Sequence, residues 1–196
     1  MPVIPLKRPG FWKVPAAAWL LWAAPAAARV VENVDVPETA AAAGQTLTLN
    51  GAGLRTATIF NVKVWVGAFY APVPIRSEAE ALASPGPLRF DFRFVRKVGR
   101  ARGAEAWRWQ FAESNQHRYD DLKKDVEVLA EAFGPIENGT VQTVILADGD
   151  TLILEDGAEK ARVSGRDFQK AFLSVFFGPK PPMESLKRAW LGNPAP

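Results

Sequence analysis

Residues 58–70 carry the sequence TIFNVKVWVGAFY, and this stretch decides the fold class. β-Branched and aromatic side chains dominate it, so it favours an extended chain over a helix. Its length predicts a long or bent central pair of strands, with Asn61 at the bend. Immediately upstream, residues 45–50 alternate as a short strand. The Gly-Ala-Gly sequence at 51–53 is expected to end that strand in a turn, because small residues enter turns easily.

A strict alternation over residues 88–95 predicts a strand that is buried on one side. Leu88, Phe90, Phe92 and Phe94 share one face, and charged residues occupy the positions between them. A core must therefore lie against the aromatic face of this strand.

The other periodic segments supply helices and further strands. Apolar residues at helical spacing predict helices over 77–83, 103–115, 119–133, 168–176 and 183–191, and alternating segments predict strands over 140–147, 151–155 and 158–163. Ser77 and Asp167 are expected to cap the helices that follow them. The four alanines at 40–43 are expected to form a flexible connector. This order of elements predicts an α+β domain in which an antiparallel sheet carries helices layered on one face.

The first 28 residues have the layout of a cleavable export signal. A basic segment with Lys7, Arg8 and Lys13 precedes an apolar stretch, and small residues follow up to Ala28, after which we expect cleavage. The alternative is a membrane anchor, but the apolar stretch contains prolines and is shorter than the roughly 20 residues that span a bilayer. We therefore expect a signal peptide over 1–28 and one domain over 29–196. After cleavage this domain has no membrane span and is periplasmic or secreted.

Charge and cysteine content narrow the function classes. The net charge of +3 comes from the three basic residues of the leader, so residues 29–196 are neutral overall and no nucleic-acid partner is expected. The chain has no Cys and a single His, His117, so we expect no metal, no nucleophilic catalytic residue and no cofactor. A local basic excess is consistent with either a solvated loop or a contact for an acidic lipid or partner; it comprises Arg93, Arg96, Lys97, Arg100 and Arg102.

Arg55 differs from these surface charges in its position. It follows the Gly-Ala-Gly sequence and precedes a strongly apolar strand, so its guanidinium is expected at the mouth of a core cavity. A buried guanidinium needs an anion or several acceptors. That partner is either a bound ligand or a carboxylate of the same fold.

Residues 51–55 and 62–70 together resemble the opening motif of the chalcone isomerase-like family. In that family a glycine-rich segment ending in Arg leads into a strand that runs on to a Tyr. The segments 106–115 and 165–178 resemble the exported bacterial branch of the family. The resemblance implies an open-faced β-sandwich of the chalcone isomerase type, in which helices cover a curved antiparallel sheet and a ligand cleft lies between the layers.

The family includes enzymes that close a chalcone to a flavanone and non-catalytic relatives that bind fatty acids. Arg55 matches the Arg that attracts the substrate oxygen in the enzymes and the carboxylate in the fatty-acid binders. Trp65 stands where the enzymes have Thr and the fatty-acid binders have Tyr. An indole donates one hydrogen bond and accepts none, so Trp65 can hold a carboxylate but cannot relay a proton. Residues 102–109 also lack the Tyr, Lys and Asn that the enzymes use.

The resemblance therefore favours an exported, non-catalytic protein that binds a fatty acid or a similar amphiphilic carboxylate. Arg55 and Trp65 are the expected ligand-binding residues. The aromatic residues expected around the tail are Phe90, Phe92, Phe172 and Phe176. Two alternatives remain: an isomerase that acts as an intramolecular lyase on a chalcone-like phenolic enone, and a structural or partner-binding periplasmic protein with a filled cleft.

Overall fold

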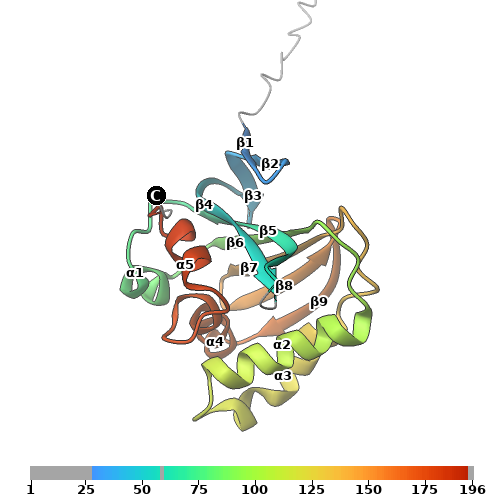
Figure 1. Cartoon of the computed structure of the whole chain (residues 1–196). Coiled ribbons are helices and arrows are strands. Elements are labelled where there is room, and N and C mark those ends of the chain that lie inside the picture. The colour runs from blue at the N-terminus through green and yellow to red at the C-terminus, as the bar shows by residue number, and fades with distance from the viewer. Residues whose placement is uncertain (1–27, 58–59, 194–196) are drawn as a thin grey trace, which may run out of the picture.

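The structure is a computed structural model that describes residues 28–57 and 60–193 (Figure 1). Its strands are β1 (Ala28–Val31), β2 (Val34–Pro37), β3 (Thr39–Ala42), β4 (Gln45–Ala57), β5 (Val62–Ala71), β6 (Leu88–Phe94), β7 (Val141–Ala147), β8 (Asp150–Glu155) and β9 (Ala158–Ser164). Its helices are α1 (Glu78–Ala83), α2 (Arg100–Ser114), α3 (Tyr119–Glu131), α4 (Arg166–Phe177) and α5 (Glu184–Trp190). The predicted signal peptide lies outside the described residues, except for Ala28, which begins β1.

Seven strands form one curved antiparallel sheet in the order β3-β4-β5-β6-β7-β8-β9 (Figure 1). Each strand pairs with its neighbour along the chain, as short connections favour. Strands β1 and β2 form a separate two-stranded sheet. None of the helices within 28–57 and 60–193 has the length and apolar character of a membrane span.

Two groups of buried residues show that the long helices cover one face of the sheet. The larger group joins strand residues to residues of α2, α3, α4 and α5. The smaller group, on the opposite face, is drawn from strands alone, among them β2, β4 and β5. These findings confirm the predicted α+β class, with a curved antiparallel sheet and helices layered on one face.

Strand β6 shows how the sequence pattern produces this layering. Phe90 and Phe92 are fully buried on the helix-covered face. On the opposite face, Arg89 Nε lies 2.9 Å from Asp91 Oδ1, and the hydroxyl of Thr143 in β7 donates to the same carboxylate oxygen over 2.7 Å. Two of the polar positions of the strand, Arg89 and Asp91, therefore bond to one another, and the aromatic positions form the core.

The predicted turn at 51–53 is wrong, because β4 continues through these residues. Strand β4 pairs with β5 along this segment, with a register shift between Leu49 and Gly51. These glycines allow α5 to pack closely against the strand. A Cβ atom at Gly51 would lie 2.0 Å from the carbonyl oxygen of Ala189, and one at Gly53 would lie 3.1 Å from the Leu186 side chain.

The alanines at 40–43 are not a connector either. Strand β3 pairs with β4 up to Ala42, and the turn between the strands consists of Ala43 and Gly44, which have φ angles of 48° and 73°. Two positive φ angles are typical of the tight hairpin turn that suits the twist of antiparallel strands. Pairing with β4 thus overrides the weak strand propensity of alanine. The analogous hairpin of β1 and β2 was not predicted.

Most of the remaining boundaries agree with the predictions. The Ser77 hydroxyl accepts a hydrogen bond from the amide of Glu80 over 3.2 Å, so it caps α1 as expected. Asn61 has a φ of 51° immediately before β5, as a bend requires. Helix α4 begins one residue before the predicted cap, so Asp167 lies in its first turn instead of capping it.

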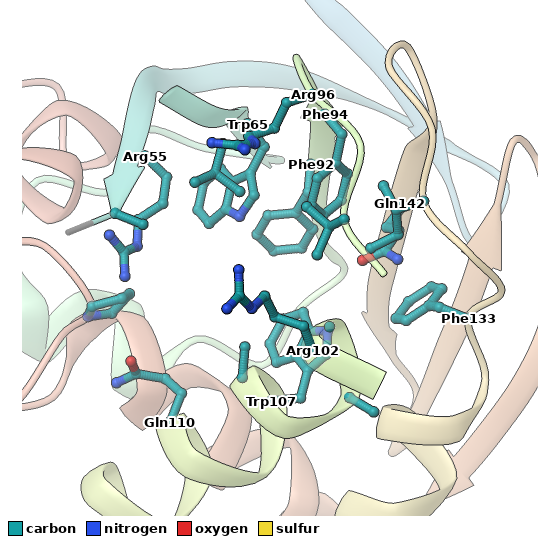
Figure 2. Close-up of a pocket in the computed structure, with 18 of the residues that line it drawn as sticks. Arg55, Trp65, Phe92, Phe94, Arg96, Arg102, Trp107, Gln110, Phe133 and Gln142 are labelled. Atoms are coloured by element: carbon teal, nitrogen blue, oxygen red, sulfur yellow. The ribbon is translucent and has the colours of Figure 1, made fainter. Parts of the chain in front are cut away.

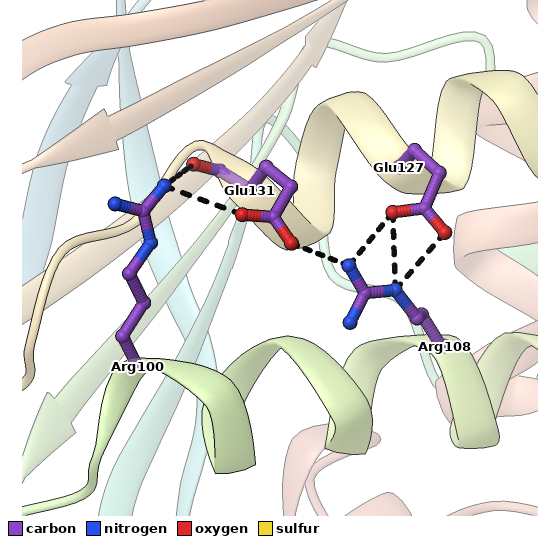
Figure 3. Close-up of polar contacts among 4 residues, drawn as sticks. All are labelled: Arg100, Arg108, Glu127 and Glu131. Atoms are coloured by element: carbon purple, nitrogen blue, oxygen red, sulfur yellow. Dashed lines mark hydrogen bonds and ion pairs between the residues drawn. The ribbon is translucent and has the colours of Figure 1, made fainter.

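Helices α2 and α3 are joined by a network of ion pairs (Figure 3). Arg108 Nη2 lies 2.7 Å from Glu127 Oε2, and Arg108 also contacts Glu131. Arg100 donates to the carbonyl and the carboxylate of Glu131, each over 3.2 Å. Because the two carboxylates stabilise the charged guanidinium, they raise the pKa of Arg108, and Arg108 in turn lowers the pKa of Glu127. The network fixes α2, which forms one wall of the site described next.

Candidate functional site

A cavity of about 540 Å³ lies between α2 and strands β5 and β6 (Figure 2). Its volume falls within the range of about 300–1,000 Å³ that is usual for small-molecule sites. The walls are mostly apolar and comprise Ala57, Val62, Val64, Trp65, Phe92, Phe94, Val98, Ala104, Ala106, Trp107, Trp109, Ala130, Phe133, Ile136, Phe176 and Pro182, among others. Such a wall suits an extended apolar group.

Arg55 reaches this cavity from the end of β4. It is the cross-strand partner of Trp65 in β5, so the sheet brings the two predicted residues side by side in the cavity wall. The Arg55 side chain is half-buried, and it has no hydrogen-bond or ion-pair partner among residues 28–57 and 60–193. Burial lowers the pKa of Arg55, but a guanidinium remains charged at any physiological pH. The fold therefore presents to the cavity a cation that no described residue neutralises.

Trp65 is positioned by aromatic packing. Its ring meets Phe92 edge-on, with 5.0 Å between the ring centroids. It also lies over Gly67, where an added Cβ would come within 2.6 Å of the Trp65 ring and 2.7 Å of the Trp190 ring. The indole N–H of Trp65 has no acceptor in the part of the chain that the structure describes, so it is free to donate to a ligand.

The rim of the cavity carries more positive charge. Arg96, Lys97 and Arg102 line it together with Arg55, and none of its described lining residues is Asp or Glu. Lys97 is paired with Glu137 over 2.7 Å, whereas no ion pair or hydrogen bond joins the guanidinium of Arg96 or Arg102 to another described residue. Figure 2 shows the guanidinium groups of Arg55 and Arg102 extending into the cavity, one from the sheet and the other from α2.

The basic excess noted in the sequence is thus split by the fold. Arg96, Lys97 and Arg102 line the cavity. Arg100 binds Glu131. Arg93 lies on the opposite face of β6 from Phe92 and Phe94, and is exposed there.

The cavity lining contains two buried amides that sequence reasoning missed. Gln142 is 1% exposed, and its Nε2 has no hydrogen-bond partner among the described residues. Gln110 is also buried, but it donates to Ser114 Oγ and to the carbonyl of Lys180. The signal for Gln142 was an amide near the start of β7, a strand that is otherwise apolar except for Thr143. A buried donor without a partner is costly in an empty site and useful in an occupied one.

Several residues of the motif and of the expected tail pocket lie elsewhere. Tyr70 belongs to the opposite face of the sheet, where its hydroxyl donates to the carbonyl of Pro37 over 3.1 Å, and burial raises its pKa. Of the four phenylalanines expected around a tail, Phe92 and Phe176 line the cavity, whereas Phe90 and Phe172 are packed in the core.

The lining residues can bind but offer little acid–base chemistry. The described part of the lining has no hydroxyl, imidazole or carboxyl side chain. Within the described ranges, no three His, Asp or Glu side chains gather as a metal site would require. His117 is exposed and outside the cavity. The arrangement favours binding of an anion with an apolar tail.

The comparisons with known proteins agree with this architecture. A crystal structure of a fatty-acid binding protein from Arabidopsis thaliana is similar to the chain, with a TM-score of 0.60 and 14% sequence identity over 86% of this chain and 97% of that one. At this identity the likeness shows the fold alone. No curated protein matches the sequence significantly. The profile of the chalcone isomerase-like family matches residues 28–192. The chain therefore belongs to the chalcone isomerase-like family.

Proposed function

We propose that this protein is a non-catalytic binding protein for a fatty acid or a similar amphiphilic carboxylate. One observation carries the proposal: an apolar cavity of about 540 Å³ has in its wall the half-buried guanidinium of Arg55, which no described residue pairs with. A carboxylate supplies the missing partner of that guanidinium. The tail would lie along the aromatic wall, and each buried CH₂ group would contribute about 0.8 kcal/mol.

Trp65 is the second proposed ligand contact. Its indole N–H can donate to a carboxylate oxygen beside Arg55, since the two residues are cross-strand partners. The similar Arabidopsis protein is a fatty-acid binding protein by its description, which supports the same class of ligand here. The alternative of a chalcone-type isomerase lacks a comparable observation, because the described lining offers no hydroxyl to take part in proton transfer.

Export is a further part of the proposal and is supported by the sequence of residues 1–28. In a bacterial host, the full chain should be recovered from the periplasm or medium with Arg29 at its N-terminus. Recovery from the cytoplasm with residue 1 intact would contradict export and leave the binding proposal standing.

The binding proposal is tested with hexadecanoic acid and hexadecanol as a pair of equal chain length. In Arg55→Gln, the affinity for the acid should fall by about tenfold or more, because a hydrogen-bonded charge pair contributes roughly 1.5–3 kcal/mol. The affinity for the alcohol should change little. Arg93→Gln removes the same charge from the opposite face of the sheet and serves as the matched control. Equal losses for the acid and the alcohol would refute the role of Arg55 in binding the head group.

A further inference from the structure

The cavity carries more positive charge than one carboxylate can neutralise. Four cationic side chains of the described residues line it, and among these four only Lys97 has a described carboxylate as a partner. Arg55, Arg96 and Arg102 remain, and they come from β4, from the loop before α2 and from α2 itself. A ligand with one negative charge would pair with one guanidinium and leave the positive charge of the other two unbalanced, and Arg96 and Arg102 lie at the exposed rim of the cavity.

Arg102 is the most informative of these three residues, because its neighbours on α2 have other partners. Arg100 and Arg108 both bind carboxylates of α3 and so hold the two helices together (Figure 3). Arg102 follows Arg100 by two positions, which places it about 200° further around the helix. It points into the cavity, and no described residue of α3 bonds to it (Figure 2). Packing of α2 on α3 therefore does not account for Arg102.

We propose that Arg102 and Arg55 form a two-guanidinium clamp for a doubly charged head group, so that the preferred ligand is a single-chain phosphate monoester. The inference rests on the proposed function, since it assumes that the cavity holds an anionic amphiphile. A phosphate monoester carries two negative charges and three acceptor oxygens near neutral pH. Planar guanidinium groups bind such oxygens in pairs, so one group can approach from the sheet and the other from the helix.

Because the cavity wall is apolar, the hydrocarbon chain is an essential part of this ligand. Most of the remaining lining is aromatic and aliphatic, with Phe92, Phe133 and Trp107 among its residues. Inorganic phosphate would leave this surface uncovered, and it would gain none of the roughly 0.8 kcal/mol per CH₂ group that burial of a chain supplies.

The test compares hexadecyl phosphate with hexadecanoic acid on the protein expressed from the full chain, by calorimetry below the aggregation limit of both ligands. At about pH 8 the phosphate carries two charges and the carboxylate one, whereas at about pH 5.5 the phosphate mostly carries one charge, because its second pKa lies near 6, and the carboxylate remains mostly ionised. We expect a preference for the phosphate of about fivefold at the higher pH, which is the contribution of one partly exposed charge pair. The preference should be clearly smaller at the lower pH.

Variants assign that preference to the clamp. Arg102→Gln should abolish the preference at the higher pH, because it lowers the affinity for the phosphate more than the affinity for the acid, whereas Arg93→Gln should keep the preference. Inorganic phosphate in excess should not displace either ligand. Equal affinities at the higher pH, or a preference that survives Arg102→Gln, would overturn the clamp while leaving the proposed function intact. Displacement by inorganic phosphate would overturn the single-chain ligand, and failure of both ligands to bind would overturn the proposed function itself.

Discussion

Gly51→Ala should be strongly destabilising, because α5 lies directly on β4 at this position. A Cβ atom there would lie 2.0 Å from the carbonyl oxygen of Ala189 and 2.9 Å from the Cα atom of Trp190. Both contacts involve backbone atoms, so no change of side-chain rotamer can relieve them. The helix would have to move by about 1 Å to reach the shortest separation of roughly 3 Å that real Cβ contacts show.

The movement would disturb well-ordered contacts at the end of α5. Trp190 is fully buried, and its indole donates to the carbonyl of Gly67 over 3.0 Å. The Asn50 amide donates to the Trp190 carbonyl and accepts from the amide of Ile75. Overpacking costs about 1–3 kcal/mol, and the loss of one buried hydrogen bond costs about 1 kcal/mol more. The free energy of unfolding should therefore fall by about 2–4 kcal/mol.

Urea unfolding followed by far-ultraviolet circular dichroism measures this change. Gly53→Ala is an intermediate case, because its Cβ would meet only the side chains of Leu186 and Ala189, at 3.1 Å. Gly134→Ala is the control, since the nearest atom to its Cβ would be a carboxylate oxygen at 3.6 Å. We expect a graded series, with Gly51→Ala the least stable and the control at or slightly above the stability of the parent protein. A Gly51→Ala protein as stable as the control would refute the close approach of α5.

Two further changes probe the opposite face of the sheet and the helix pair. Tyr70→Phe should lower the free energy of unfolding by about 1 kcal/mol, because the hydrogen bond to the Pro37 carbonyl is lost. Ligand affinity should not change, and an altered affinity would place the phenol in the cavity. Glu127→Gln should be less stable than the parent near neutral pH, because Arg108 lowers the pKa of Glu127 in the folded state. That contribution is present above the unfolded pKa of about 4.5 and is lost as the pH falls below it, so denaturation midpoints of the two proteins should converge in acid. A constant gap between them would argue against the pair.

The sequence was sufficient for most elements because their periodicity is strong. The alternation at 88–95 and the helical spacing of Leu122, Val126 and Leu129 each have a single consistent interpretation, and these residues are buried as predicted. The β1–β2 hairpin was missed because its turn, at Glu32 and Asn33, has φ angles of 50° and 63° without a glycine. Such a turn gives no composition signal that distinguishes it from other polar loops.

The glycines of β4 show a different limit of sequence reasoning. A glycine is required wherever a Cβ atom is not tolerated. This is the case in some turns, and it is also the case where a helix packs closely on a strand. The choice between the two depends on Ala189 and Leu186, which lie more than a hundred residues further along the chain. No local pattern at 51–53 contains that information.

The candidate site was predictable in part for the same reason. Arg55 was identifiable from its unusual place before an apolar strand, and pairing with β5 brings Trp65 beside it. From the sequence, Arg102 was recognised only as part of a basic segment. Whether a residue of this segment binds α3, as Arg100 does, or lines the cavity, as Arg102 does, depends on which face of α2 meets α3. The role of Gln142 could not be predicted, because it lines the cavity only once β7, which lies far along the chain, has paired with β6.

Strand β4 connects the packing of the fold to the position of Arg55. Gly51, Gly53 and Arg55 follow one another on the helix-covered face of the strand. The two glycines have no side chain, whereas Arg55 has a long one. The two glycines let α5 lie against the strand, and Pro182, just ahead of the helix, contributes to the cavity wall. Arg55 therefore lies where the cover of α5 has ended, so its guanidinium meets the cavity instead of the core. A change at Gly51 that lifts α5 would alter this wall as well, so stability and ligand affinity should fall together in that variant, whereas in Arg55→Gln affinity should fall with little loss of stability.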